Sequence, residues 1–373
     1  MKTSNIARII IMLLLVFTVT CVAAQMPLPC DGAKIDTAAL RKARQFETAN
    51  KKNGRVQAPR FLIRIFFHIG TDDDGTNAVI TPQMLKQEFD TLRADYAAAG
   101  ICFSFAGYDY MNSTKLNNNF IKNTDDPVLF DPYRQTSCIN VFYVQKINGV
   151  NTACANNCGI GGTSLSIPST ICLISKPNIG PGRTISHEVG HCMGLLHTFE
   201  KSRGLENIDG GNSSSSGDLI TDTPADPYVF NGTACFIVSG CTYQGYCTDP
   251  NGEKNYIPPY TNLMSYWTSV VNRTCIPALY LTLGQYNRLY SFLSTDAFLL
   301  SCGTDYVDYT ITAVSKDRGG FFWTAFGTIS TSGNVDLSGT LKAAIGAQTI
   351  RLHKGFHASV TTGRIIISST VCK

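Results

Sequence analysis

Apolar residues gather into short runs along the first half of the chain, and polar turns separate the runs. Phe61–Ile69 is apolar at most positions, which predicts a buried strand; Ile101–Phe105, Cys138–Val144 and Thr170–Ser175 have the same character. Thr81–Gly100 instead places its apolar residues at helical spacing between a Thr-Pro start and a stopping glycine, which predicts a helix. Strands with one helix between them indicate a half built on a central sheet.

Two further patterns extend this region. Gly159–Pro168 has the character of an edge strand whose far end is limited by its proline. Such an edge can bind an extended peptide by main-chain pairing, or it can be an ordinary edge that a neighbouring strand covers. Thr282–Leu293 opens with a Thr-x-x-Gln capping box, which predicts another helix.

After Cys302 the pattern changes to short alternating segments with glycines between them, which predicts a small β-rich domain over residues 302–373. A disulfide from Cys302 to Cys372 could close this domain. The whole chain is therefore expected to be α+β, with a larger domain over residues 61–301 around a mixed twisted sheet. The alternating segments are Val307–Val314, Phe321–Ile329, Thr349–Leu352 and Arg364–Ser368.

The first 24 residues are typical of a cleaved secretory signal. Lys2 and Arg8 precede the apolar run Ile9–Phe17, and residues 22–24 offer a small-residue cleavage site. The run is too short to span a membrane, and a lipid-modified Cys21 is the alternative. We therefore expect a secreted, extracellular protein, which agrees with the glycosylation patterns at Asn112, Asn212, Asn231 and Asn272.

Composition narrows the class of partner. The 373 residues are 44% hydrophobic and 16% charged, as in a globular chain, and the net charge of +4 falls when the two basic residues of the signal are removed. This balance does not indicate a nucleic-acid partner, and no membrane partner is expected after signal removal. The oligomeric state is left open. Of 14 cysteines, all but Cys21 would remain in an exported protein, so most should be paired and one should be left over.

The chemistry of the chain is concentrated in the stretch His-Glu-Val-Gly-His-Cys-Met-Gly-Leu-Leu-His, which begins at His187. In a helix His187 and His191 are neighbours one turn apart, so their imidazoles can reach one ion. Gly194 can end that helix in the left-handed conformation and bring His197 to the same ion. Three nitrogen ligands leave one position for water, as in catalytic zinc sites, and Glu188 can accept the proton of that water.

A second motif, Asn-Leu-Met-Ser-Tyr, begins at Asn262, 65 residues after His197. The unbranched side chain of Met264 can fill the irregular space beneath three converging imidazoles. Tyr266 can bring its hydroxyl near the zinc ion and donate to a developing oxyanion.

Two other predictions of metal ligands, one for zinc and one for calcium, each have a structural alternative. Residues 25–60 contain Cys30 and a helix-compatible stretch, which predicts a pro-segment or an N-terminal wrap. The Cys30 thiolate could bind the zinc and hold the protein latent, or Cys30 could be in a disulfide. Cys192, on the apolar stripe of the zinc helix, competes as the unpaired thiol and is expected to be an inert buried residue. Three aspartates could give oxygens to a calcium ion or simply cap turns: Asp218, Asp222 and Asp226.

With these residues in place, the chain resembles the pappalysin-type metzincins, the group of the ulilysin and cytophagalysin proteases. The resemblance covers roughly Phe61 to Ser301 and does not reach the C-terminal domain. Beyond the histidine motif it rests on Thr198-Phe199, Asp222-Thr223-Pro224, Asn262-x-Met264-x-Tyr266, and Thr282-x-Gly284-Gln285 followed by Arg288.

The resemblance implies a secreted zinc endopeptidase that acts on proteins or peptides, with an upper subdomain carrying the sheet and zinc helix and a lower one after the glycine. By position, it implies zinc binding by the three histidines, Glu188 as the base, Met264 as the methionine of the turn and Tyr266 as a donor to the transition state. Some members also bind calcium. The alternative is a catalytically inactive binding glycoprotein on a protease scaffold; a purely structural zinc site would need a fourth protein ligand.

Overall fold

The computed structural model describes residues 33–52, 61–122, 124–148, 159–180, 183–228, 236–239, 242–266 and 279–304, followed by the strands of the C-terminal region. The expected signal segment and Cys30 lie outside these residues, as does Trp267, which follows the second motif. No helix in the described part of the chain is long and apolar enough to cross a membrane.

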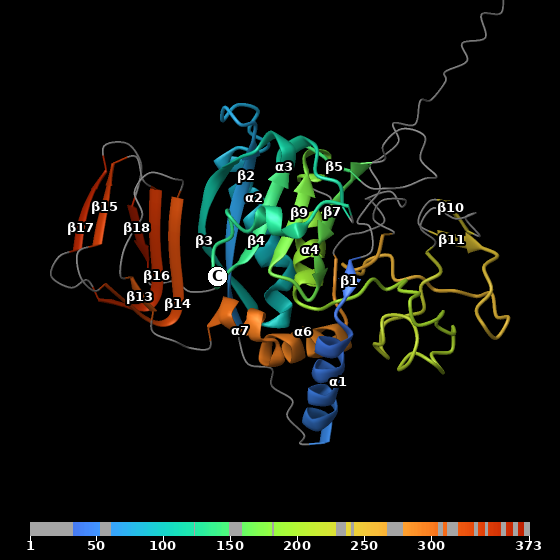
Figure 1. Ribbon diagram of the computed structural model, residues 1–373. Helices are drawn as coiled ribbons and strands as arrows, with labels where there is room; N and C mark the ends of the chain where they lie inside the picture. Colours follow the sequence, from blue (N-terminus) through green and yellow to red (C-terminus); the bar gives the residue numbers. More distant parts are fainter. Residues whose placement is uncertain are drawn as a thin grey trace, which may run out of the picture.

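A mixed six-stranded sheet lies at the centre of the molecule (Figure 1). Four strands run parallel, and the two short strands β7 and β12 run antiparallel to their neighbours. β3 occupies one side of β2 along its whole length, so β4 and β12 share the other side. In spatial order the strands are β3 (Ile101–Asn112), β2 (Phe61–Thr71), β4 (Ile139–Val144), β9 (Ile171–Ser175) and β7 (Gly162–Ser164), with β12 (Gly303–Thr304) beside β2.

The structure corrects the expectation of one edge strand over Gly159–Pro168. This stretch forms three short strands, of which only β7 belongs to the main sheet, as its last strand. Hydroxyl groups interrupt the ladder: Ser164 Oγ donates to the carbonyl of Ser166 and Ser166 Oγ to that of Pro168. The other two strands pair elsewhere: β6 (Gly159–Ile160) with β5 (Ile147–Asn148), and β8 (Ser166–Ile167) with β1 (Lys34–Ile35).

Helices begin and end where the capping residues predict. α2 (Pro82–Tyr96) is capped by the Thr81 hydroxyl and passes into the 3-10 helix η1 (Ala97–Ala99), which Gly100 ends at φ 69°. α6 (Leu283–Thr295) has the predicted capping box of Thr282 and Gln285. The other short helices are α3 (Thr114–Asn118), η2 (Pro127–Phe130), η3 (Lys176–Asn178) and α7 (Ala297–Cys302).

The sheet separates two apolar cores. The larger joins the odd-numbered residues of β2 to α2, to α6 and to α4 (Thr184–Cys192), the helix that carries His187 and His191. The smaller, on the opposite face, joins β4 and β9 to α3 and η2. α1 (Thr37–Lys52) packs against α6 and places Leu40 and Ala43 in the larger core, so this N-terminal helix is built into the fold.

From β14 (Gly320–Thr331) onward the C-terminal strands alternate between two parallel sheets, and paired residues of neighbouring strands are 20 to 22 positions apart in the sequence. β14, β16 (Lys342–Arg351) and β18 (Ile365–Ser368) lie in one sheet, next to β13 (Tyr309–Ile311). β15 (Val335–Gly339) and β17 (Phe356–Val360) form the other. A separate hairpin, β10 (Phe236–Ser239) and β11 (Thr242–Gly245), precedes the second motif.

The expected Cys302–Cys372 disulfide is wrong, because Cys302 is a free thiol buried in the larger core at the end of α7. Cys192 is also free and buried on the core stripe, as expected. Cys138 is free as well and Cys172 is fully buried, whereas Cys102 and Cys247 are in disulfides. The prediction failed because Cys302 packs into the larger core at the end of α7, and it is not available to pair with a cysteine of the C-terminal region.

Glu88 is a buried acid on α2 with a pH-dependent effect. Its side chain is only 3% exposed, and its Oε1 accepts from the amide of Gly180 at 2.8 Å, in the segment that leads to α4. Burial raises its pKa from 4.5 to about 7, and the bonds from Gly180 and Tyr143 offset part of the rise. Between pH 4.5 and about pH 7 Glu88 is protonated more often in the folded state than in the unfolded state. Its contribution to the free energy of unfolding therefore falls as the pH rises through this range.

Glu88→Gln should therefore be more stable than the wild type at pH 8, by about 1–3 kcal/mol, because glutamine never carries the buried charge and can still accept from Gly180. The gain should shrink toward zero near pH 4. Urea unfolding at the two pH values measures it, with the exposed Glu253→Gln as control. An equal difference at both pH values contradicts this account of Glu88.

Candidate metal centre

The helix that carries the first two histidines is held at its start by α2. Arg183, just before α4, has a left-handed φ of 58° and pairs with Asp95. Asp95 also accepts from Ser186 Oγ at 2.6 Å, and the Tyr96 hydroxyl donates to the carbonyl of Ser186 at 2.7 Å. These contacts fix the helix along its axis and about it.

α4 ends where the sequence predicts. Gly194 has a φ of 95°, and a side chain there would also overlap Phe292, whose ring atoms would lie 2.1–2.5 Å from the added Cβ. The chain turns back at this glycine, and the backbone amide of Leu195 still bonds to the carbonyl of Gly190 at 3.0 Å. Gly194 therefore brings His197 back to the helix, as its position in the motif indicates.

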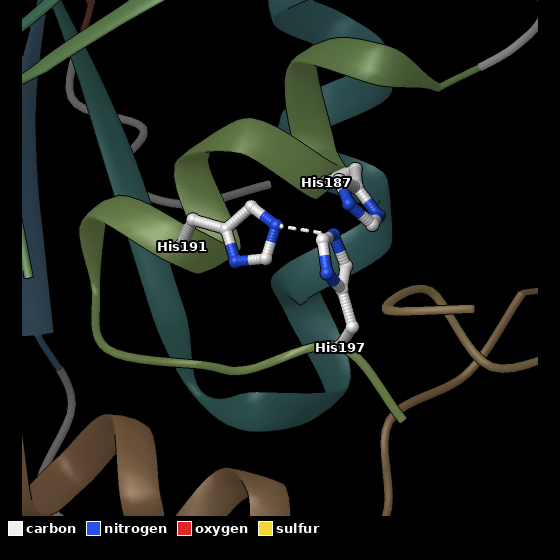
Figure 2. A group of neighbouring side chains, drawn as sticks. All are labelled: His187, His191 and His197. Atoms are coloured by element: carbon white, nitrogen blue, oxygen red, sulfur yellow. Dashed lines mark hydrogen bonds between the residues drawn. The ribbon is translucent and has the colours of Figure 1, made fainter. Parts of the chain in front are cut away.

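The three histidines meet (Figure 2). His187 and His191 project from α4, His197 comes from the returning segment, and their ligand atoms all lie within 4.8 Å of one another. The two Nε2 atoms of His191 and His197 are 2.9 Å apart. Among the described residues this is the one group of three or more His, Cys, Asp or Glu side chains that could hold a metal ion.

Backbone carbonyls set the tautomers. Nδ1 of His187 faces the carbonyl of Leu263 at 2.8 Å, and Nδ1 of His191 faces that of Leu195 at 2.7 Å. A carbonyl only accepts, so each Nδ1 carries the hydrogen and each Nε2 keeps its lone pair. Nε2 of His187 is buried without a hydrogen-bond partner, as expected for an atom that awaits an ion.

Burial also keeps the rings neutral. It lowers the pKa of His187 to about 4, against a partial rise from the Leu263 carbonyl. For His191 and His197 burial is again the main cause, and the neighbouring histidines lower the pKa further. All three therefore offer unprotonated nitrogens at neutral pH, which metal binding requires.

The second motif lies beneath this cluster. The carbonyl of Met264 accepts from the amide of Thr198 at 3.2 Å, which ties the turn to the third histidine. Met264 is fully buried, and a Cβ on Gly190 would lie 2.7 Å from its sulfur. The amide of Met264 donates to Asn262 Oδ1 at 2.9 Å, and Asn262 exchanges two hydrogen bonds with Gln285 of α6. The turn is thus fixed between α4 and α6.

Aromatic side chains close one side of the centre. The hydroxyl of Tyr266 lies 3.0 Å from Nε2 of His197, which places it beside the expected ion. Phe199 stacks on the ring of His197 at 4.6 Å between centroids, and Tyr228 lies edge-on to Tyr266. This wall covers one side of the histidines and packs against the tyrosine.

Glu188 is fully buried on α4, and the edge strand β7 passes directly over it. A Cβ on Gly162 would lie 2.6 Å from Glu188 Oε1 and 2.7 Å from the Thr184 methyl group. Sequence reasoning missed this role of Gly162. Its signal is the Gly161-Gly162 pair in a strand, since glycine inside a strand marks a close approach.

The three aspartates proposed for calcium do not come together. Asp222 accepts from the amide of Gly284 at the start of α6, and Asp226 accepts from Thr198 Oγ1 at 2.6 Å. Asp218 is buried and accepts from the amide of Ile220. Each carboxylate thus accepts from its own partner, and the three do not form a group whose oxygens lie close enough to hold one ion.

These features define a buried metal centre of three neutral histidines beside a carboxylate. No family model matches the chain. It is 27% identical over 254 residues to an extracellular metalloprotease of Colletotrichum graminicola, covering 65% of this chain and 79% of that protein. It is 24% identical over 252 residues to one of Podospora anserina, covering 61% and 80%. A similar protein of Arthroderma benhamiae is 28% identical over 183 residues, covering 45% and 56%. These relatives support a metalloprotease.

We expect Gly162→Ala to keep the metal but to lower kcat at least tenfold, because the added methyl group must displace the carboxylate of Glu188 or the strand above it. Metal content and peptide hydrolysis on the same sample measure both effects. Gly211→Ala is the control, since Gly211 is exposed and the nearest atom to an added Cβ would be the end of the exposed Asp209 side chain, at 3.1 Å. Wild-type kcat in Gly162→Ala would contradict the placement of Glu188.

Proposed function

We propose that the protein is a secreted zinc endopeptidase of the pappalysin-type metzincins, in which Glu188 is the general base. The observation that carries the proposal is the convergence of three neutral imidazoles, whose ligand atoms lie within 4.8 Å of one another. The buried Glu188 directly follows the first of these histidines in the sequence. The extracellular metalloproteases to which the chain is similar support the same activity and location.

The donor set favours zinc. Three neutral nitrogens suit this ion, and a catalytic site keeps one position open. His187, His191 and His197 would hold it. The carbonyls of Leu195 and Leu263 orient two of the rings from behind, as the outer partners of zinc histidines usually do. We propose no calcium site on the three aspartates.

A bound zinc ion supplies Lewis acidity, which acidifies water and polarises a carbonyl group. Glu188 accepts the proton of the attacking water and passes it to the leaving amine nitrogen. The Tyr266 hydroxyl, 3.0 Å from His197 Nε2, donates to the oxyanion that forms on the attacked carbonyl. Met264 and the wall of Phe199 and Tyr228 hold these groups in place.

The substrate we propose is an extended stretch of protein. β7 is the last strand of the main sheet among the described residues, and it passes over Glu188. An extended peptide that pairs with the outer side of β7 would bring a peptide bond to the carboxylate.

Replacing the base separates metal binding from catalysis. Glu188→Ala should keep stoichiometric zinc and lose nearly all casein hydrolysis, since the variant lacks the carboxylate that accepts the proton of the attacking water. His191→Ala, the companion variant, should lose zinc and activity together. Zinc analysis and a chelator-sensitive casein assay give both readings. Substantial hydrolysis by Glu188→Ala would refute the assignment.

The tyrosine is expected to act only in the transition state. Tyr266→Phe should lower kcat by about 10²–10³ with little change in KM, because the lost donor binds the oxyanion and not the ground-state carbonyl. Tyr228→Phe, in the same aromatic wall, is the matched control for packing. A Tyr266→Phe enzyme with wild-type kcat would remove the tyrosine from the mechanism.

A further inference from the structure

The N-terminal helix α1 is joined to α6 by an ion pair in which the arginine is buried and the glutamate is partly exposed. Arg288 of α6 is 1% exposed, and its Nε donates to Glu47 Oε1 of α1 at 2.5 Å. Its Nη2 donates to the carbonyl of Leu219 at 3.0 Å and lies 3.5 Å from Glu47 Oε2. Nη1 has no partner within the described chain. Glu47 thus carries the charge that balances a guanidinium with almost no access to water.

The pair leads directly to the histidines. One helical turn before Arg288, Gln285 is fully buried and bonds twice to Asn262, at 2.8 and 3.1 Å. Asn262 holds the amide of Met264, and the residue between them, Leu263, gives the carbonyl that orients His187. The hydrogen bonds of Gln285, Asn262 and the Leu263 carbonyl are all buried, so a shift of α6 moves the turn and the first imidazole.

The segment before α1 is fastened separately. β1 pairs with β8, the amide of Asp36 donates to the carbonyl of Ile167 at 2.8 Å, and Ala33 packs with Ile167 and Leu196. Leu196 directly precedes His197. The N-terminal segment therefore touches the metal centre from two sides, through α6 and through Leu196.

We propose that residues 33–52 stay in the active enzyme and that Glu47 is a remote positioning residue for the metal site; this rests on the proposed zinc function. Removal of the segment would expose the apolar residues of the larger core that pack against Leu40 and Ala43, and it would take away the carboxylate that pairs with Arg288. A maturing cut must then fall before Ala33. Such a cut can release Cys30 and leave α1 in place. Within residues 25–60, the proposed latency role would then belong to the part before Ala33, and the structural role would belong to residues 33–52.

The first test is the N-terminus of active material. Sequencing of the secreted, zinc-loaded enzyme should find a start at or before Ala33. A fully active enzyme that starts after Lys52 would overturn the proposal. If the wild-type protein holds no zinc at all, the proposed function fails instead, so the two failures are distinguishable.

The second test is Glu47→Ala, measured well below its unfolding temperature. It should lower Tm and also release zinc to a chelator several-fold faster than the wild type, with a lower kcat. Glu47→Gln, which keeps an acceptor for Arg288, should lie between the two. Leu116→Ala, in the smaller core on the opposite face, is the control that lowers Tm without changing zinc release. A wild-type release rate in folded Glu47→Ala would overturn the positioning role.

Discussion

The hydrogen bonds from two imidazole Nδ1 atoms to backbone carbonyls are the interactions on which the site depends. Leu195 and Leu263 provide these carbonyls, at 2.7 and 2.8 Å, and so direct the Nε2 lone pairs of His191 and His187 toward one point. Without these bonds either ring could rotate or take the other tautomer. Its Nε2 lone pair would then not face the metal position, even though burial keeps the ring neutral. The metal affinity of the site therefore depends on the backbone conformation that holds the two carbonyls in position.

The rest of the fold holds those carbonyls. Leu195 lies just after Gly194, whose left-handed φ of 95° and contact with Phe292 set the return of the chain. Leu263 lies in the turn fixed by Asn262 and Gln285. α4, between them, is held by contacts from α2 and packs on the sheet. Two helices and a turn from distant parts of the chain thus meet at one ion-sized space.

Local patterns predicted most of the site, because its chemistry lies in short motifs. Helical spacing pairs His187 with His191, and only a residue without Cβ tolerates the turn at position 194. The strands and the capped helices also follow local rules, as at Thr81 and Thr282. The mixed sheet agrees with expectation, whereas the finer family assignment rests on the motif.

What the sequence did not reveal depends on distant partners. Asp222 looks like a metal ligand in its loop, but its partner is an amide 62 residues away. Glu47 and Arg288 are 241 residues apart, and no local pattern pairs them. Serine hydroxyls divided the expected edge strand, and Cys302 joined the core before it instead of the domain after it. In each case a non-local contact decided between two locally reasonable structures.

The most direct measurement is X-ray absorption at the zinc edge of the purified secreted enzyme, together with its zinc content. The account predicts one zinc ion per chain, with three imidazole nitrogens and one oxygen from solvent in its first shell. A protein without zinc, or a zinc ion with a fourth protein ligand in the processed enzyme, would contradict it.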